Sequence, residues 1–217
     1  PAGSGNDFAV MNGAPANVAQ ACRVIVEGRT RRIDVAKVTI DDDPVQYMDN
    51  TLGIGFDGLV TRGCLDYKRL RGMALYLPVV LKTVFVDMQV PDVEITYDGN
   101  TIRKKALMTV ICNGPREGAA FRVAPGAQTD DGLLDLLVAE DMPRLGVLSM
   151  IPRFMKGTHL SHKSTELHQV EHVVVASEDP LYLHMDGEIV CDVAHRVEAR
   201  VIPGCLEMVT SEACANV

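Results

Sequence analysis

The sequence lacks any long hydrophobic run. None of its apolar stretches approaches the roughly 18 residues that a membrane-spanning helix requires, and the chain does not open with a basic segment followed by an apolar one. We therefore expect any contact with lipid to be made from the surface of a membrane. The chain starts at Pro1 and enters a glycine-rich turn at once, which indicates a piece of a longer protein.

An excess of positive charge is also missing. The net charge is −8, and no stripe of Lys and Arg alternates with aromatic residues, so we do not expect nucleic acid as a partner. The six cysteines form no CxxC pair, which argues against a zinc site or a disulfide framework. Scattered thiols of this kind are typical of a reducing compartment, and we expect a cytoplasmic protein.

The residues that are present are typical of a folded protein. The 217 residues are 47% hydrophobic and 23% charged, and a chain of this length can bury a core. Apolar residues at helical spacing predict helices over 8–25, 65–85 and 143–155. Short alternating segments predict strands over 33–38, 93–97, 102–112, 133–139, 170–176, 181–185 and 195–202.

This order of elements predicts an α+β fold. Residues 1–32 are interpreted as a fragment of an α/β nucleotide-binding domain, and residues 33–205 as a mainly antiparallel, sandwich-like β domain with two helices. Residues 206–217 are interpreted as a C-terminal tail.

A glycine-rich turn precedes the first predicted helix. It consists of Gly3, Ser4, Gly5, Asn6 and Asp7. Glycines allow close approach of a polyanion, and backbone N–H groups together with the Ser and Asn side chains could bind phosphate. An ordinary helix cap, with Asn or Asp satisfying the first N–H groups, explains the same residues without any ligand.

Two further clusters contain carboxylates next to glycine. Asp130 and Asp131 stand before Gly132 and the strand that begins near Leu134, and their oxygens suit Mg²⁺. Asp186 follows an apolar strand and could take a proton from an attacking hydroxyl, with Glu188 two residues later. Asp-Gly is also a common turn sequence, so both clusters could be turns alone.

Two segments have a structural and a functional interpretation. Two glycines within the apolar segment 50–57 favour tight backbone packing in a strand. The segment 153–163 mixes basic and apolar residues and could lie against anionic headgroups, although an amphipathic helix packed on its own domain explains it equally well. His159 and His162 within it have ligand-like spacing, but polar residues facing solvent are the favoured interpretation.

Taken in order, these segments resemble those of the bacterial soluble diacylglycerol kinase-like lipid kinases, a family that includes sphingosine and ceramide kinases. The match extends from Pro1 to about residue 205. Its segments are Gly3 to Ala9, which is similar to GTGNDFA, Ile33 to Val35, Gly53 to Asp57, which resembles GxGFDA, Asn113-Gly114, Ala124 to Ala127, Asp130 to Asp135, and His184 to Glu188.

The resemblance implies an ATP- and Mg²⁺-dependent kinase that phosphorylates a lipid hydroxyl, with diacylglycerol expected first. It implies that Gly3 to Asp7 contact the ATP phosphates and that Asp7 and Asp34 join the Mg²⁺ and water network. It also implies a metal site at Asp130, Asp131 and a carbonyl near Leu134. Asp186 would be the catalytic base, and Glu188 would be its neighbour in the motif.

The sequence departs from the family pattern in three places. Ser4 replaces a common Thr, Val10 replaces a common Arg, and the upstream GGDGT motif is missing. We therefore expect the missing N-terminal half as a partner and little kinase activity from these 217 residues alone. The expected lipid substrate lies at the inner membrane face, and a homodimer is compatible with this interpretation. A kinase of a soluble acceptor such as NAD, or a non-catalytic β domain that binds lipid or protein, remains the alternative.

Overall fold

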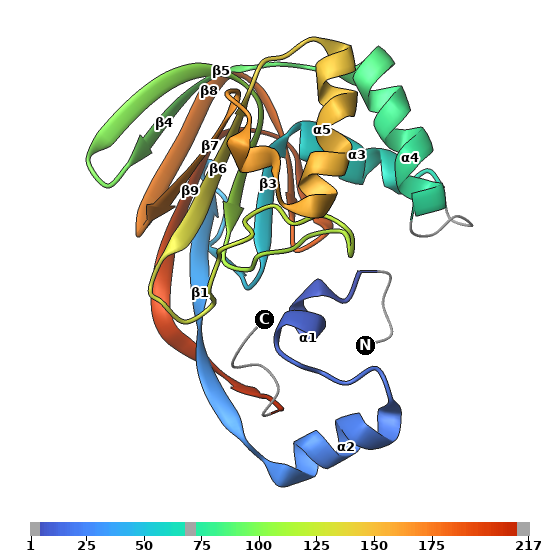
Figure 1. Ribbon diagram of the computed structural model, residues 1–217. Coiled ribbons are helices and arrows are strands. Elements are labelled where there is room, and N and C mark those ends of the chain that lie inside the picture. Colours follow the sequence, from blue (N-terminus) through green and yellow to red (C-terminus); the bar gives the residue numbers. More distant parts are fainter. Residues whose placement is uncertain (1–4, 68–72, 212–217) are drawn as a thin grey trace.

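The computed structural model describes residues 5–67 and 73–211. Its helices and strands follow each other along the chain (Figure 1) as α1 (Asp7–Met11), α2 (Val18–Glu27), β1 (Thr30–Ile40), β2 (Gln46–Met48), β3 (Thr51–Gly55), α3 (Phe56–Cys64), α4 (Met73–Lys82), a π-helical turn (Thr83–Asp87), β4 (Asp92–Tyr97), β5 (Asn100–Cys112), β6 (Leu134–Glu140), α5 (Arg144–Lys156), a 3-10 turn (His159–Ser161), β7 (Thr165–Val170), β8 (His172–Met185) and β9 (Glu188–Val209).

All strand pairs in the described residues are antiparallel and belong to one sheet of nine strands. The sheet order is β2-β1-β9-β8-β3-β5-β6-β7. β4 stands outside this path and pairs with both β5 and β8, as β3 does. β3 and β4 therefore lie one after the other between the same two long strands. The predicted α+β fold with a mainly antiparallel β domain is confirmed.

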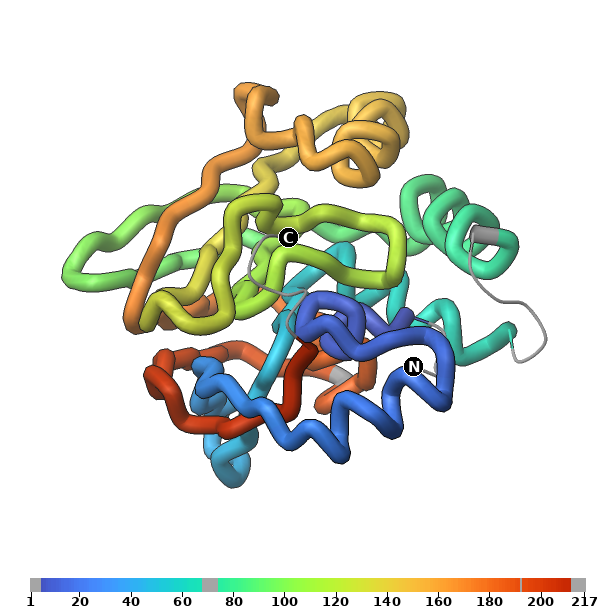
Figure 2. Tube along the Cα trace, turned by 60° about the horizontal axis from the view of Figure 1, so that its bottom comes forward, coloured from blue at the N-terminus to red at the C-terminus, as the bar shows by residue number. Residues whose placement is uncertain are grey.

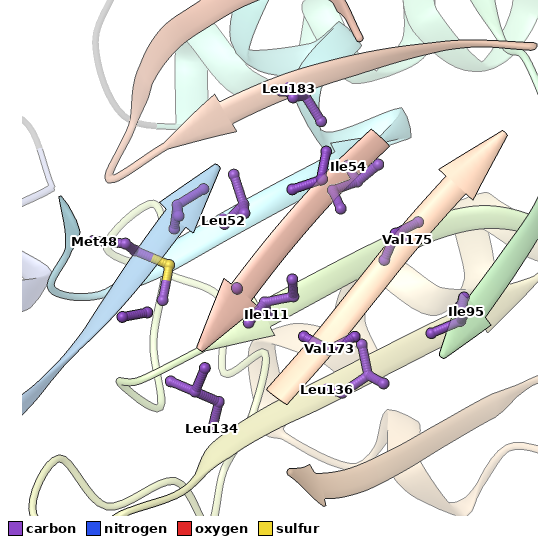
Figure 3. Packing of buried hydrophobic residues seen from close by; sticks show 14 of the residues in the cluster. Met48, Leu52, Ile54, Ile95, Ile111, Leu134, Leu136, Val173, Val175 and Leu183 are labelled. Atoms are coloured by element: carbon purple, nitrogen blue, oxygen red, sulfur yellow. The ribbon is translucent and has the colours of Figure 1, made fainter. Parts of the chain in front are cut away.

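Side chains of this curved sheet pack against each other in the main core. Alternate residues of the strands meet there and are almost fully buried, among them Met48, Leu52, Ile95, Ile111 and Leu136 (Figure 3). The central strands β3 and β6 are buried on both faces. One face packs in the main core, and helices cover the other. This second layer is what creates the site described below.

Helices α3, α4 and α5 form that second layer (Figure 1). Their apolar side chains, including Val60, Val79, Val147 and Met150, make a separate cluster with Leu107 of β5. Within the described residues, no helix is long and apolar enough to cross a membrane.

Three sequence-based predictions about helices are corrected. The helix predicted over 8–25 is two helices, since residues 12–17 between α1 and α2 form turns and include Pro15, which disfavours a helical residue before it. The glycine-rich segment 50–57 does form β3, but the chain then turns directly into α3, which was not predicted. The β domain therefore has three α-helices among its described residues instead of two.

Two Asp-Gly pairs form hairpin turns, and one of them is the turn that the sequence allows at Asp186. Asp98 and Gly99 join β4 to β5, and Asp186 and Gly187 join β8 to β9. Both residues of each pair have positive φ, from 43° to 86°, as a tight two-residue hairpin requires. β1 begins at Thr30 and pairs with Val209 at the end of β9, so the sheet extends beyond both predicted limits of the β domain.

Candidate active site

The glycine-rich turn rests on a loop from the middle of the chain. Gly3 and Ser4 lie outside the described residues, and Asn6 adopts a left-handed conformation with φ 60° before α1. Asp7 Oδ2 accepts a hydrogen bond of 2.8 Å from the backbone N–H of Ala119. Figures 1 and 2 both place the loop after β5 between α1 and α5. The turn that we expect to bind phosphate is therefore adjacent to this loop.

Asp34 fixes two turns of the chain. It is buried in β1, and its two carboxylate oxygens accept hydrogen bonds of 2.7 Å from the backbone N–H groups of Gly132 and Gly204. Asp34 thus connects β1 to the turn before β6 and to β9. Its expected part in a Mg²⁺ network stays a prediction.

The turn with Asp130 and Asp131 contains paired carboxylates. Asp130 lies 3.5 Å from the guanidinium of Arg31, and Asp131 Oδ1 accepts a hydrogen bond from Leu133 N. Burial, together with the negative charge of Asp131, raises the pKa of Asp135 to about 6. Two such carboxylates have the donor chemistry for a hard cation. The metal site expected with Leu134 stays a prediction.

Asp186 lies in the β8–β9 hairpin turn and binds the backbone of another loop. Its Oδ1 accepts hydrogen bonds from the N–H groups of Asn50 (3.0 Å) and Thr51 (2.9 Å), and its Oδ2 accepts one from Asp49 N (3.2 Å). Although Asp186 is exposed, partial loss of hydration in the turn raises its pKa, and the backbone bonds and the charge of His184 offset this only in part. Glu188, at the start of β9, is exposed. Both carboxylate oxygens of the expected base therefore hold the segment between β2 and β3.

A different group of titratable residues converges beside the helices. His184 Nε2 of β8 lies 2.9 Å from Asp57 Oδ2 of α3 and 2.8 Å from Glu117 Oε1 in the loop after β5. The side chain of His184 is fully buried, and those of Asp57 and Glu117 are 21% and 14% exposed. Among the described residues this is the one cluster of three metal-ligand type side chains. We call it the acidic triad.

The charges within the acidic triad control its pKa values. Burial and the charge of Asp57 raise the pKa of Glu117 to about 6, although His184 lowers it. Burial alone would lower the pKa of His184, but the charges of Glu117 and Asp57 raise it well above its usual value. Gly53 packs directly on this group, since a Cβ there would lie 2.3 Å from His184 Nε2 and 2.4 Å from Asp57 Oδ2.

Two members of the acidic triad, Asp57 and Glu117, line an apolar pocket. Among the described residues that line this pocket, only Asp57 and Glu117 carry charge. The walls come from α3, α4, α5, β5, β6 and the loop, and include Phe56, Val60, Val80, Leu107, Phe121, Met142, Val147, Met150, Ile151 and Phe154. Tyr76 packs edge-on against Phe121 beside the carboxylates. The cavity measures about 100 Å³, so it has room for a short apolar group beside Asp57 and Glu117 and would have to widen for a longer one.

Residues 50–210 match the family described as the YegS C-terminal NAD kinase beta sandwich-like domain. Residues 1–38 match the diacylglycerol kinase catalytic domain. The chain belongs to the diacylglycerol kinase and YegS-like lipid kinase family. The resemblance found in the sequence is confirmed.

Individual relatives cover almost the whole chain. A relative named diacylglycerol kinase, from Mycobacterium tuberculosis, is 26% identical over 96% of this chain and 67% of its own length. A protein named "Probable lipid kinase YegS-like", from Chromohalobacter salexigens, is 30% identical over 99% of this chain and 67% of its own. The crystal structure of a diacylglycerol kinase from Bacillus anthracis superposes with a TM-score of 0.70 at 20% identity, covering 99% of this chain and 66% of that one. This last likeness shows the fold.

The sequence analysis of this lipid kinase chain did not identify the acidic triad. Asp57 and His184 were quoted as parts of motifs, but neither received a role, and Glu117 was not singled out.

The interpretation of His159 as facing solvent is wrong. Its ring is buried, stacks on Phe154 at 4.0 Å between centroids, and lies 3.0 Å from the carbonyl oxygen of Val123.

Proposed function

We propose that the protein containing this chain is an ATP- and Mg²⁺-dependent lipid kinase. It transfers the γ-phosphoryl group of ATP to a lipid hydroxyl, and diacylglycerol is the first expected acceptor. The observation that carries this proposal is the apolar pocket in which, among the described lining residues, only Asp57 and Glu117 carry charge. The part of the lipid next to its hydroxyl would gain free energy by leaving water for the apolar walls, while the lipid hydroxyl would donate to a carboxylate.

The position of the pocket supports transfer from a nucleotide. Glu117 and Ala119 lie two residues apart in the loop after β5, and Ala119 N donates to Asp7 of the glycine-rich turn. A lipid hydroxyl at Glu117 would therefore lie near the segment that we expect to contact ATP phosphates. Phosphoryl transfer depends mainly on such positioning and on neutralisation of charge.

The phosphate and metal ligands follow the family pattern in this proposal. Gly3 to Asp7 would contact the phosphates, and Asp130, Asp131 and a carbonyl near Leu134 would hold Mg²⁺. When bound, Mg²⁺ supplies positive charge that offsets charge on the phosphates. Asp34 would support the metal site indirectly by holding the turn before β6, because its carboxylate accepts a hydrogen bond from Gly132 N.

The pocket helices also suit a peripheral contact with the inner membrane face. Leu77 and Leu81 of α4 are exposed, as are Phe85 and Val86 in the π-helical turn that follows it. These side chains could enter the headgroup region while the lipid chain passes between the helices. In this proposal the protein is cytoplasmic and takes its substrate from the membrane surface.

The assay should use the full-length protein that includes the nucleotide-binding half. Labelled ATP and mixed micelles containing diacylglycerol should yield labelled lipid, whereas the 217-residue chain alone should yield little. A parallel reaction with NAD tests the soluble-acceptor alternative. Absence of labelled lipid with diacylglycerol, long-chain base and other lipid alcohols would end the lipid kinase proposal.

A pair of variants tests whether the pocket holds the acceptor. Val80 lines the pocket, and its neighbour Leu81 on α4 is 37% exposed. Val80→Trp should fill the pocket and lower kcat/KM for the lipid by at least about tenfold, which corresponds to about 1.4 kcal/mol. Leu81→Trp should leave it within about twofold. Equal activity of the two variants, with both folded by circular dichroism, would place the acceptor elsewhere.

A further inference from the structure

Two segments that contact each other contain basic residues but no acidic ones. Residues 118–129 lie in the loop after β5, and residues 142–165 contain α5 and the 3-10 turn. Their Lys and Arg residues are Arg122, Arg144, Arg153, Lys156 and Lys163. Neither segment contains Asp or Glu, although the whole chain has 29 of them and a net charge of −8. These two segments therefore form a positive region on an acidic protein.

Three of these cations gather at the end of α5. Arg122 N donates a hydrogen bond of 2.9 Å to Phe154 O in the last turn of the helix. The Arg122 side chain packs beside Gly157, where the helix ends, since a Cβ at Gly157 would lie 3.3 Å from Arg122 Cδ. Arg153 and Lys156 belong to the same last turn.

The chain that follows α5 adds a fourth cation and an apolar side chain. Thr165 Oγ1 donates a hydrogen bond of 2.6 Å to His159 O, so the chain around Lys163 folds back on the 3-10 turn. Leu160 in this turn is 36% exposed, and Met155 in α5 is 39% exposed. We use the name basic surface for Arg122, Arg153, Met155, Lys156, Leu160 and Lys163.

All four cations of the basic surface are exposed, and none has an acidic partner among residues 5–67 and 73–211. A cation in the last turn of a helix stabilises it by opposing the helix dipole, and this accounts for Arg153 and Lys156. It does not account for Arg122 and Lys163, which lie outside α5, or for the two exposed apolar side chains beside them.

On the basis of the proposed function, we propose that the basic surface docks on the anionic headgroups of the membrane that contains the lipid substrate. The Arg and Lys side chains would lie beside lipid phosphates, and Met155 and Leu160 would enter the headgroup region. The same membrane would repel the acidic remainder of the protein, so these cations would also orient the enzyme.

The basic surface adjoins the wall of the apolar pocket. Phe121, Val123, Ile151 and Phe154 line that pocket, and they come from the same two segments as the cations. Docking of this surface would therefore bring the pocket next to the lipids from which the acceptor is taken.

Cosedimentation of the full-length protein with vesicles, in the absence of ATP, tests the basic surface. Vesicles of phosphatidylcholine with phosphatidylglycerol should bind the protein, whereas vesicles of phosphatidylcholine alone should bind it at least about tenfold more weakly. Binding should also fall when the salt concentration rises from about 0.1 M to about 1 M, because the Debye length shortens from about 10 Å to about 3 Å.

A double variant measures the share of two cations. Arg153→Gln with Lys156→Gln should lower the vesicle partition coefficient about 25-fold, because each Lys or Arg near an anionic surface contributes about fivefold. Lys156→Gln alone should lower it about fivefold, which keeps the test available if the double variant unfolds. The matched control, Lys37→Gln with Arg103→Gln, removes one exposed Lys and one exposed Arg from β1 and β5. It should bind within about twofold of the wild type, because charges far from the membrane are screened.

Three results would overturn the docking surface. These are wild-type binding by the Arg153→Gln, Lys156→Gln variant, equal losses in that variant and in the control, and equal binding to vesicles with and without phosphatidylglycerol. A lower Tm of the first variant with unchanged vesicle binding would also overturn it, since protein such as the N-terminal half would then cover these residues.

The same assays separate the docking surface from the proposed function. A wild-type protein that binds anionic vesicles through these cations but phosphorylates no lipid would remove the proposed function and keep the surface. An active kinase whose Arg153→Gln, Lys156→Gln variant binds vesicles as the wild type does would remove the surface alone.

Discussion

Substitution of Gly53 by alanine should disrupt the acidic triad without touching any of its three residues. The new Cβ would lie 2.3 Å from His184 Nε2, 2.7 Å from His184 Cδ2 and 2.4 Å from Asp57 Oδ2. Ordinary van der Waals contacts of carbon begin at about 3.4 Å. The imidazole must therefore move by about 1 Å, and since its side chain is fully buried it has no solvent to move into.

The size of the effect follows from the interactions that this movement breaks. His184 Nε2 has one N–H, which Asp57 and Glu117 share, and a hydrogen bond to a charged group is worth about 1.5–3 kcal/mol. Overpacking costs about another 1–3 kcal/mol, whereas the lower conformational entropy of the unfolded alanine variant offsets about 0.4–1 kcal/mol. If the shared hydrogen bond is lost, we expect the free energy of unfolding to fall by about 2–5 kcal/mol.

Urea denaturation of the 217-residue chain at pH 7.5, followed by circular dichroism, measures this loss. Gly126→Ala is the control, because a Cβ at Gly126 has no atom within 4 Å. The control should change the free energy of unfolding by less than about 1 kcal/mol. If Gly53→Ala is as stable as Gly126→Ala, then His184 and Asp57 do not pack on Gly53 as described, and the geometry of the triad is wrong.

Two further predictions concern stability away from the triad. Asp34→Ala should cost about 3 kcal/mol in urea denaturation, because the N–H groups of Gly132 and Gly204 lose their buried acceptor, and a change below 1 kcal/mol would contradict this. Asp49→Asn should raise the Tm at pH 7–8, because burial and the charge of Asp186 raise the pKa of Asp49 in the folded state to about 6, above its unfolded value. The gain, at most about 3 kcal/mol, should disappear as the pH falls from about 6 to 4, where wild-type Asp49 becomes protonated, and a gain that persists at pH 4 would refute the electrostatic cause.

Local patterns in the sequence determined most of the secondary structure and the family. Alternation of apolar residues predicted the strands that became β1, β5, β6 and β8, because side chains of a strand point to opposite faces. A turn was one interpretation of Asp186-Gly187, and the hairpin there follows from the positive φ that Asp-Gly pairs tolerate. The order of the motifs from Gly3 to Glu188 was enough to identify the lipid kinase family.

Only the tertiary structure decided what the motif carboxylates contact and where the pocket lies. Asp186 binds backbone N–H groups that are 135 to 137 positions away in the sequence. Asp34 binds two that are 98 and 170 positions away. No local pattern shows whether such a carboxylate contacts a ligand or a distant backbone group. His184 meets Asp57 across 127 positions, and Glu117 reaches them from the loop after β5, between the motif segments Asn113-Gly114 and Ala124 to Ala127. Helix α3 was missed because Gly58 and Gly63 lower its intrinsic helix preference, which packing against β8 overrides. Local patterns report which face of an element is apolar, whereas a site made by side chains from three distant elements exists only once the sheet has brought them together.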